Sequence, residues 1–420
     1  MSTRPVLDRK WSSYAATSAV FVAVCAINVP SPLYPTYQHK YHLSATTLTA
    51  IFATFAVGVL AALVLLGPLS DYVGRKPVLI AGSVMLLISS GLFLAAQGAV
   101  WLFAARAVQG LALGTISSAA SAALAELNRA NMSRAALMNT LAFTAAGTIS
   151  CLGTGLLAQY LPWRTSLCYL VLLVANLLSL VAISVMVEPL IARPDTAYRV
   201  RSPRIPRSIL GPVLVACGAM AVGWTLGGMY GSLSPSIVDL LLHGNGLVIS
   251  GAVLSLFNLV GGVGQCLASR HLPHRVMLVA VVTTMIGGVA VLLALDAKSL
   301  TLFFVATVFA GIGASIVFVG SLALVNQLSP AESRAETVTA YSMSGYIALA
   351  IPTVALGLLV THVGLKSATA VFVPILLIGG VLSSVSILRS KSHYSLDDAA
   401  RLVEPVRSVE PPAAVTEVLD

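Results

Sequence analysis

Between residues 67 and 77 the chain carries glycines and charged residues in an otherwise apolar stretch. The set consists of Gly67, Asp71, Gly74, Arg75 and Lys76, so an acid is followed by two bases four and five positions later. Such an acid can pair with bases across adjoining helix ends, or accept hydrogen bonds from the positive N-terminus of a neighbouring helix. A generic tight connector would not need these residue types in this register. The spacing therefore predicts an electrostatic contact.

A second candidate is Arg106, a permanent cation inside an apolar run. A charged side chain inside a membrane helix costs at least about 2.5 kcal/mol, so it should face a wet cavity or a partner. The alternative is snorkelling, because Arg106 lies about two turns from the outer end of its predicted helix. We expect Arg106 to attract an anionic group or influence a proton site, with Gln109 and Asn28 supplying nearby hydrogen bonds.

The other ionisable residues form no catalytic constellation. The histidine pairs His39 and His42, and His271 and His274, lie in predicted loops, and the H-E-x-x-H, nucleophile-elbow and phosphate-loop motifs are absent. The five cysteines, all inside apolar runs and without C-x-x-C spacing, are Cys25, Cys151, Cys168, Cys217 and Cys266. The sequence therefore predicts no enzyme, no metal site and no cofactor.

The elements that position these residues are apolar runs. Hydrophobic residues make up 57% of the chain and charged residues 9%, against about 25% charged in a soluble domain. Twelve runs are long enough to cross about 30 Å of hydrocarbon as helices, in which the backbone polar groups are satisfied internally. The fold class is therefore an all-α membrane protein with twelve transmembrane helices, over residues 12–33, 46–66, 77–97, 100–124, 138–158, 165–187, 209–231, 247–268, 275–295, 300–326, 338–361 and 367–388.

The start of the chain and the distribution of basic residues predict the topology. The first run is too long for the core of a signal peptide and no Ala-x-Ala site ends it, which favours an uncleaved helix. Of the 24 lysines and arginines, 19 fall at the termini or in even-numbered connections. By the positive-inside rule both termini are cytoplasmic, in a bacterial-type inner membrane with lipids as partners. The basic residues have no aromatic residues interleaved, which argues against a nucleic-acid partner.

The chain repeats itself at an offset near 200 residues. Ser31-Pro32 matches Ser234-Pro235, the Ser-Arg-Ala triplet at 133–135 matches the one at 333–335, and Gly110 matches Gly311. Two parallel six-helix units, residues 1–187 and 209–389, are expected, joined by a polar cytoplasmic linker at 188–208. The polar tail at 390–420 is expected to be cytoplasmic and disordered.

With these motifs, residues 10 to 390 resemble the major facilitator superfamily. The loop at 67–76 fits its signature, Gly-x-x-x-Asp-x-x-Gly-Arg-Arg/Lys, and residues 106–110 fit its Arg-x-x-Gln-Gly pattern. The resemblance implies two pseudo-symmetric six-helix bundles and a loop that locks them together when the transporter faces outward. In that lock Asp71 would meet the start of helix 11, and Arg75 would pair with an acid, Glu126, at the end of helix 4. The second copy of the loop, at 262–270, has Cys266 at the acid's position, which implies a weaker lock.

The resemblance also implies a transporter, working as a monomer, with a substrate cavity between the halves. Its helix 5 has glycines but not the Gly-Pro of the antiporter signature, and Gly147, Gly153 and Gly155 there suit close packing or a gating bend. Proton-coupled export of a drug-like compound or metabolite is expected, and an uptake carrier or uniporter remains open. The candidate substrate and proton-pathway residues are Asn28, Arg106, Gln109, Asn139, Trp224, Tyr230, Asn258, Phe318 and Tyr346. Each aromatic residue among them could instead serve only in packing.

Overall fold

The computed structural model describes residues 8–163, 165–190, 203–242 and 246–391, and every regular element in these ranges is a helix. Most of the predicted linker, at 191–202, and nearly all of the predicted tail, at 392–420, lie outside the described residues. The elements are α1 (Arg9–Asn28), η1 (Ser31–Leu33), α2 (Tyr34–Tyr41), α3 (Ala45–Leu65), α4 (Leu69–Val73), α5 (Arg75–Leu94), α6 (Ala99–Leu127), α7 (Met132–Tyr160), α8 (Ser166–Ser184), η2 (Arg207–Ile209), α9 (Leu210–Leu242), α10 (Leu247–Ala268), α11 (Pro273–Asp296), α12 (Leu300–Leu328), α13 (Arg334–Val363) and α14 (Leu365–Lys391).

Twelve helical segments of the described chain are long and apolar enough to cross a membrane, which confirms the predicted number. Two ends differ most from the prediction. The first span continues through η1 and α2 to Tyr41, and α9 continues to Leu242 instead of ending near residue 231. Pro235 lies inside α9 without ending it. A membrane helix tolerates such a proline because its neighbours can satisfy the freed backbone groups.

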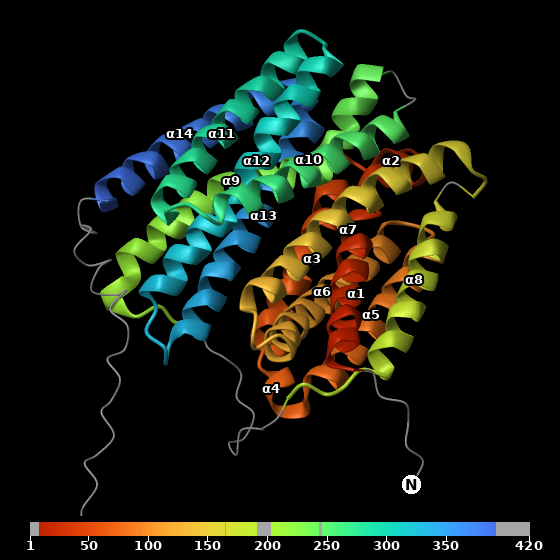
Figure 1. Cartoon of the computed structure of the whole chain (residues 1–420). Helices are drawn as coiled ribbons and strands as arrows, with labels where there is room; N and C mark the ends of the chain where they lie inside the picture. The colour runs from red at the N-terminus through yellow and green to blue at the C-terminus, as the bar shows by residue number, and fades with distance from the viewer. Residues whose placement is uncertain (1–7, 164, 191–202, 243–245, 392–420) are drawn as a thin grey trace, which may run out of the picture.

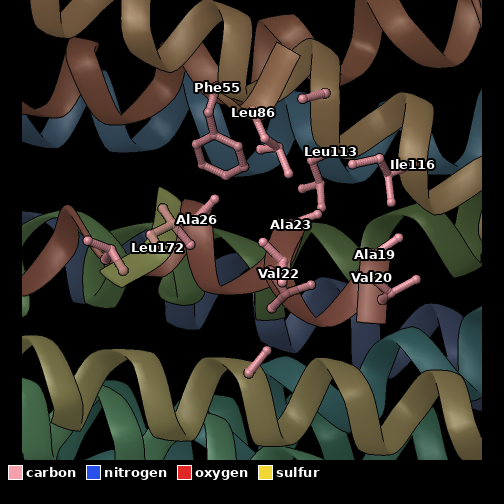
Figure 2. Packing of buried hydrophobic residues seen from close by; sticks show 14 of the residues in the cluster. Ala19, Val20, Val22, Ala23, Ala26, Phe55, Leu86, Leu113, Ile116 and Leu172 are labelled. Carbon is pink, nitrogen blue, oxygen red and sulfur yellow. The ribbon is translucent and has the colours of Figure 1, made fainter. Parts of the chain in front are cut away.

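The helices form two bundles, α1–α8 (the first bundle) and α9–α14 (the second bundle), which lie side by side in Figure 1. Each bundle has its own buried apolar cluster, with residues between 15 and 186 in one and between 213 and 387 in the other. Figure 2 shows small side chains of α1, such as Ala19 and Ala23, near larger ones such as Leu113 and Ile116 of α6. Small residues on α1 let its neighbours approach closely.

Because the spans alternate in direction, the described chain begins and ends on one side of the molecule, which we call the terminal side. The helix α4 also lies there, after two crossings, and the other side is called the opposite side. The first span is interrupted at Pro30 and Pro32, and this break, like α4, helps to position the site. Both bundles therefore place the connections that follow even-numbered spans on the terminal side and the other connections on the opposite side.

The bundles contact one another mainly through two helix pairs, α3 with α13 and α7 with α10. Near the opposite side Thr46 and Thr361 are hydrogen-bonded, with 2.9 Å between their Oγ1 atoms. Along α7 and α10, glycines replace side chains, and a Cβ on Gly155 would lie 2.6 Å from the Leu247 carbonyl oxygen. Gly147 also faces α10, at Asn258, whereas a Cβ on Gly153 would meet nothing within 4 Å. Two of these three glycines of α7, the fifth span, therefore serve close packing.

Candidate functional site

The charged loop forms an acid–base cluster at the terminal side of the first bundle. Arg75 is 7% exposed, and its guanidinium donates to Asp71 Oδ1 at 2.5 Å and to Glu126 Oε1 at 2.9 Å. Ser70 Oγ accepts a further bond at 2.7 Å from the same side chain. The planar fork of arginine suits this double pairing with carboxylates. The structure thus brings Arg75 to Glu126, the partner that the resemblance implied.

The sequence analysis missed a third acid of this cluster, Glu188. Its carboxylate oxygens accept from the backbone N–H of Arg75 at 2.8 Å and of Lys76 at 3.0 Å. These are the first amides of α5, which have no partner inside the helix, and a carboxylate is favoured at this positive end. The ammonium of Lys76 donates to the Met186 carbonyl at 2.9 Å. The only sequence signal was an acid followed by a proline at the end of an apolar run.

Gly74 and Gly67 are explained by this geometry. Gly74 has φ of 114°, a conformation that L side chains rarely adopt, and a Cβ there would lie 2.8 Å from Glu188 Oε2. A Cβ on Gly67 would lie 2.6 Å from the carbonyl oxygen of Leu63, where the chain turns back after α3. The two glycines therefore allow the turn and the approach of Glu188, while the charged residues hold the cluster together.

Arg106 lies in the interior of the first bundle and is 0% exposed, so the snorkelling alternative is wrong. Its guanidinium donates to Tyr34 Oη from Nε at 3.1 Å and also from a terminal nitrogen. It lies 5.5 to 5.9 Å from the ring centres of Tyr34, Phe52 and Phe55. Aromatic faces and a hydroxyl thus take the place of the wet cavity that the sequence suggested.

Arg106 and Gln109 also bond to the end of α1. Gln109 donates to the carbonyl of Ala26 and Arg106 to that of Ile27, both at 2.8 Å, while Gln109 Oε1 accepts from Arg106 at 2.7 Å. Pro30, which has no N–H, stands where a continuing helix would donate to Ala26. The Arg-x-x-Gln pair therefore satisfies carbonyls that the proline break leaves open, at the negative end of a helix dipole.

Asn28 is not a partner of Arg106. Its amide donates to the Val24 carbonyl at 2.8 Å, and its Oδ1 lies 3.6 Å from the sulfur of Cys151 on α7. Asn28 thus belongs to the contact between α1 and α7. The sequence placed Asn28 near Arg106 from helix position alone, and it missed Tyr34, because the break after α1 returns the chain toward α6.

Between the bundles lies a cavity of about 500 Å³, which we call the central cavity. Its wall residues come from the middle or the terminal-side part of seven helices, whereas the Thr46–Thr361 contact closes the opposite side. None of the wall residues carries a formal charge. They are Leu63, Leu113, Ser117, Ser118, Ser121, Asn139, Thr140, Phe143, Met220, Trp224, Gln265, Ala314, Ser315, Phe318, Ser342 and Tyr346.

Four of the predicted substrate residues, Asn139, Trp224, Phe318 and Tyr346, lie on this wall. Trp224 stacks on Phe318, with ring centres 6.1 Å apart, and meets Tyr346 edge-on at 5.1 Å. The three rings form an aromatic face on the second bundle. Across the wall, serines and amides supply hydrogen-bonding groups, which suits a molecule with both apolar and polar parts.

The other predicted residues lie elsewhere. Tyr230 is fully buried in the second bundle and stacks on Phe257 and Phe303. Asn258 lies at the α7–α10 contact against Gly147, and Arg106, Gln109 and Asn28 lie in the first bundle, as described above. The sequence analysis missed most polar wall residues, although their spacing on one helix face was a usable signal: Ser117, Ser118 and Ser121, and Ser342 four residues before Tyr346.

Comparison with known proteins gives the family. The model of the Major Facilitator Superfamily matches residues 16–274 and 266–411, essentially the whole chain. Among proteins of curated function, no sequence matches significantly.

Solved structures share the fold at low identity. A bacterial homolog of the human lysosomal transporter Spinster, in an inward-facing and unoccupied conformation, has TM-score 0.73 and 14% identity over 91% of this chain and 98% of its own. A single-residue mutant of the nucleoside transporter NupG has TM-score 0.70 and 11% identity over 89% of this chain and 99% of its own. A mutant of the peptide transporter POT has TM-score 0.72 and 13% identity over 92% and 96%.

Two helix bundles, a signature loop built around Arg75 and a family match along the whole length agree. The chain belongs to the major facilitator superfamily and is a membrane transporter.

Proposed function

We propose that this protein is a secondary active transporter that exports a small organic molecule by alternating access, driven by protons. The observation that carries the proposal is the central cavity, which lies between the bundles and is closed toward the opposite side by the α3–α13 and α7–α10 contacts. A transporter of this kind exposes one binding site to each side in turn, by rocking of one repeat against the other.

We further propose that the terminal side is cytoplasmic and that the protein works as a monomer in a bacterial-type inner membrane. The excess of lysine and arginine on the terminal side supports this orientation. In it, the central cavity would face the cytoplasm, where an exporter collects its substrate. The likeness to a Spinster homolog described as inward-facing agrees with that orientation.

The wall of the central cavity supports an uncharged or amphiphilic substrate. The aromatic face of Trp224, Phe318 and Tyr346 offers apolar contact, and Asn139 and Gln265 offer amide groups. Serine and threonine hydroxyls supply further hydrogen-bonding groups on the same wall. We therefore propose a drug-like compound, or a metabolite with both apolar and polar parts, as the cargo.

A uniporter or an uptake carrier is the second candidate. It is favoured by the wall itself, in which none of the residues is an acid, a base or a histidine that could take up a proton during the cycle. The carboxylates of the acid–base cluster, Asp71, Glu126 and Glu188, lie in the first bundle outside this wall. If transport is nevertheless driven by protons, the proton must bind to groups that lie beside the central cavity.

Purified protein in liposomes with an imposed pH gradient tests these alternatives. Export driven by protons predicts that a fluorescent amphiphile accumulates against its gradient while the pH gradient decays. Trp224→Ala should lose this transport, and Val181→Ala, a change at an exposed position of α8, should keep it. Equilibration without accumulation would establish a uniporter, and movement no faster than in empty liposomes would refute transport of these compounds.

A further inference from the structure

The second bundle has its own copy of the signature loop, but with a different charge balance. Cys266 stands where the first loop has Asp71, and Arg270 stands where it has Arg75. Gln327 is the penultimate residue of α12, as Glu126 is of α6. The two carboxylates that pair with Arg75 in the first bundle thus have neutral counterparts in the second.

The copied loop ends at Arg270, and His271 and Arg275 follow it closely. Arg270, His271 and Arg275 are all exposed on the terminal side, between α10 and the first turn of α11. Within the described part of the chain, neither Arg270 nor Arg275 forms an ion pair with a carboxylate. The first bundle neutralises its loop, whereas among the described residues no carboxylate pairs with the two arginines of this surface.

Beside these cations lies a second cavity, of about 550 Å³, which we call the lateral groove. It is bounded by α10, α11 and α12, and Arg275 forms its charged end, with the ring of His271 beside it. The floor is made by Val276 and Ile316, each 5% exposed, and Gly264 adds no side chain to it. The other lining residues are apolar: Leu259, Val260, Val263, Leu267, Ala268, Val279 and Ile312.

The dimensions of the lateral groove match half a bilayer. From Leu267 to Leu259 the groove follows α10 for eight residues, or about 12 Å, against about 15 Å for the hydrocarbon of one leaflet. Leu259, Val263 and Leu267 are exposed, so the groove opens sideways toward lipid and not into the central cavity. Its charged end lies on the terminal side, where the headgroups of that leaflet would be.

We propose that the lateral groove binds an anionic phospholipid of the terminal-side leaflet. One acyl chain lies between α10 and α11 over Ile316, and the phosphate meets Arg270, His271 and Arg275. Basic pockets between membrane helices are suited to anionic headgroups because cations near the surface attract them. A soluble anion would use the cations but leave the apolar groove empty, so a lipid accounts for both features.

Native mass spectrometry of the full-length protein, with phosphatidylglycerol and phosphatidylcholine added to the detergent, tests the proposal. The protein should retain phosphatidylglycerol adducts in preference to phosphatidylcholine. Arg270→Gln/Arg275→Gln should weaken phosphatidylglycerol binding roughly tenfold or more, since each basic residue near the surface adds to the attraction. Val279→Trp, which fills the lateral groove from its exposed rim, should weaken binding while leaving the charges in place.

The matched control is Arg129→Gln/Arg134→Gln, which removes two exposed cations on the same side of the first bundle. It should leave the adducts unchanged. Equal losses in both double variants would show only general attraction to a basic surface and would overturn the proposal. So would displacement of phosphatidylglycerol by millimolar inorganic phosphate, or a dimer mass without lipid, which would assign the lateral groove to a second copy of the chain.

Discussion

At the scale of single residues, Arg75 holds three parts of the first bundle together. Its side chain joins α4 to the end of α6, and its backbone N–H joins α5 to Glu188 beyond α8. A buried cation shared by two carboxylates depends on both, because losing one partner leaves a buried charge without compensation. The signature loop is therefore a structural joint of the first bundle in the described conformation.

Replacing Arg75 by methionine should destabilise the folded protein by about 3–5 kcal/mol, the usual effect of breaking a buried ion pair from one side. The transport rate should fall as well, because Asp71, Glu126 and Ser70 lose their common donor. Thermal unfolding in detergent and flux in liposomes measure the two effects. Arg129→Met, at an exposed position on the same side, is the control, and equal stability of the two variants would contradict the role of Arg75.

Asp71→Asn is expected to cripple flux while the protein stays folded and inserted. The amide keeps the size of the side chain but weakens the 2.5 Å charge-assisted bond to Arg75. Flux per folded molecule, measured in liposomes with the protein quantified by gel filtration, gives the result. Turnover equal to that of the unchanged protein would mean that the loop is only a connector.

Gly74→Ala should destabilise the protein by about 1–3 kcal/mol, because alanine resists an extended backbone at positive φ and its methyl group would press on Glu188. Gly91→Ala is the matched control, since Gly91 is inside α5 and a Cβ there meets nothing within 4 Å. The control should be neutral or stabilising by a few tenths up to about 1 kcal/mol. Thermal unfolding of the two variants compares them directly, and equal midpoints would count against the strain at Gly74.

At the scale of elements, the break in the first span explains why the bundle contains Arg106 and Gln109. The side chains complete the hydrogen bonding of α1 where Pro30 and the following turn interrupt it. This gives the Arg-x-x-Gln pattern a structural role in this chain. It also ties α6, which lines the central cavity, to the point where the first span changes direction.

The break can be tested by a double substitution. Gln109→Leu should destabilise the protein by about 1–3 kcal/mol, because it leaves the Ala26 carbonyl without a donor in an apolar environment. Adding Pro30→Ala should recover part of the loss, since an alanine N–H at position 30 can donate to Ala26 as in a continuous helix. Thermal unfolding of the two single variants and the double variant shows the coupling. Strictly additive effects would refute this account of the break.

The sequence predicted the helices better than their ends and partners. Long apolar runs identify the membrane spans, because only a long apolar helix can cross the hydrocarbon core of a bilayer. The spacing of Asp71 and Arg75 identified the loop. Glu188 escaped because its role depends on α8 ending beside α5, a tertiary contact with no local pattern. Tyr230 was misleading for a related reason, since an aromatic residue on a predicted cavity helix can equally face the core of its own bundle.

At the scale of the whole molecule, the two bundles meet where side chains are small and separate around the central cavity. Gly155, Gly251 and Gly357 bring the partner helices close enough that a Cβ would lie within 2.6 Å of a neighbouring atom. Such surfaces can part and meet again without rearranging large side chains. The glycine contacts on α7, α10 and α13 therefore form an interface suited to opening during the transport cycle.

Locking that interface should stop transport while leaving the central cavity accessible from the terminal side. The pair Thr46→Cys/Thr361→Cys, in a background with exposed Cys266 replaced by serine, should form a disulfide because the native Oγ1 atoms lie 2.9 Å apart. Oxidised protein should show no flux, and reduction should restore it. A third substitution, Ser121→Cys on the cavity wall, should react with a maleimide added to the terminal side whether or not the lock is closed. Flux that survives the closed disulfide would show that these contacts do not have to open, and loss of labelling would show that the locked state hides the central cavity.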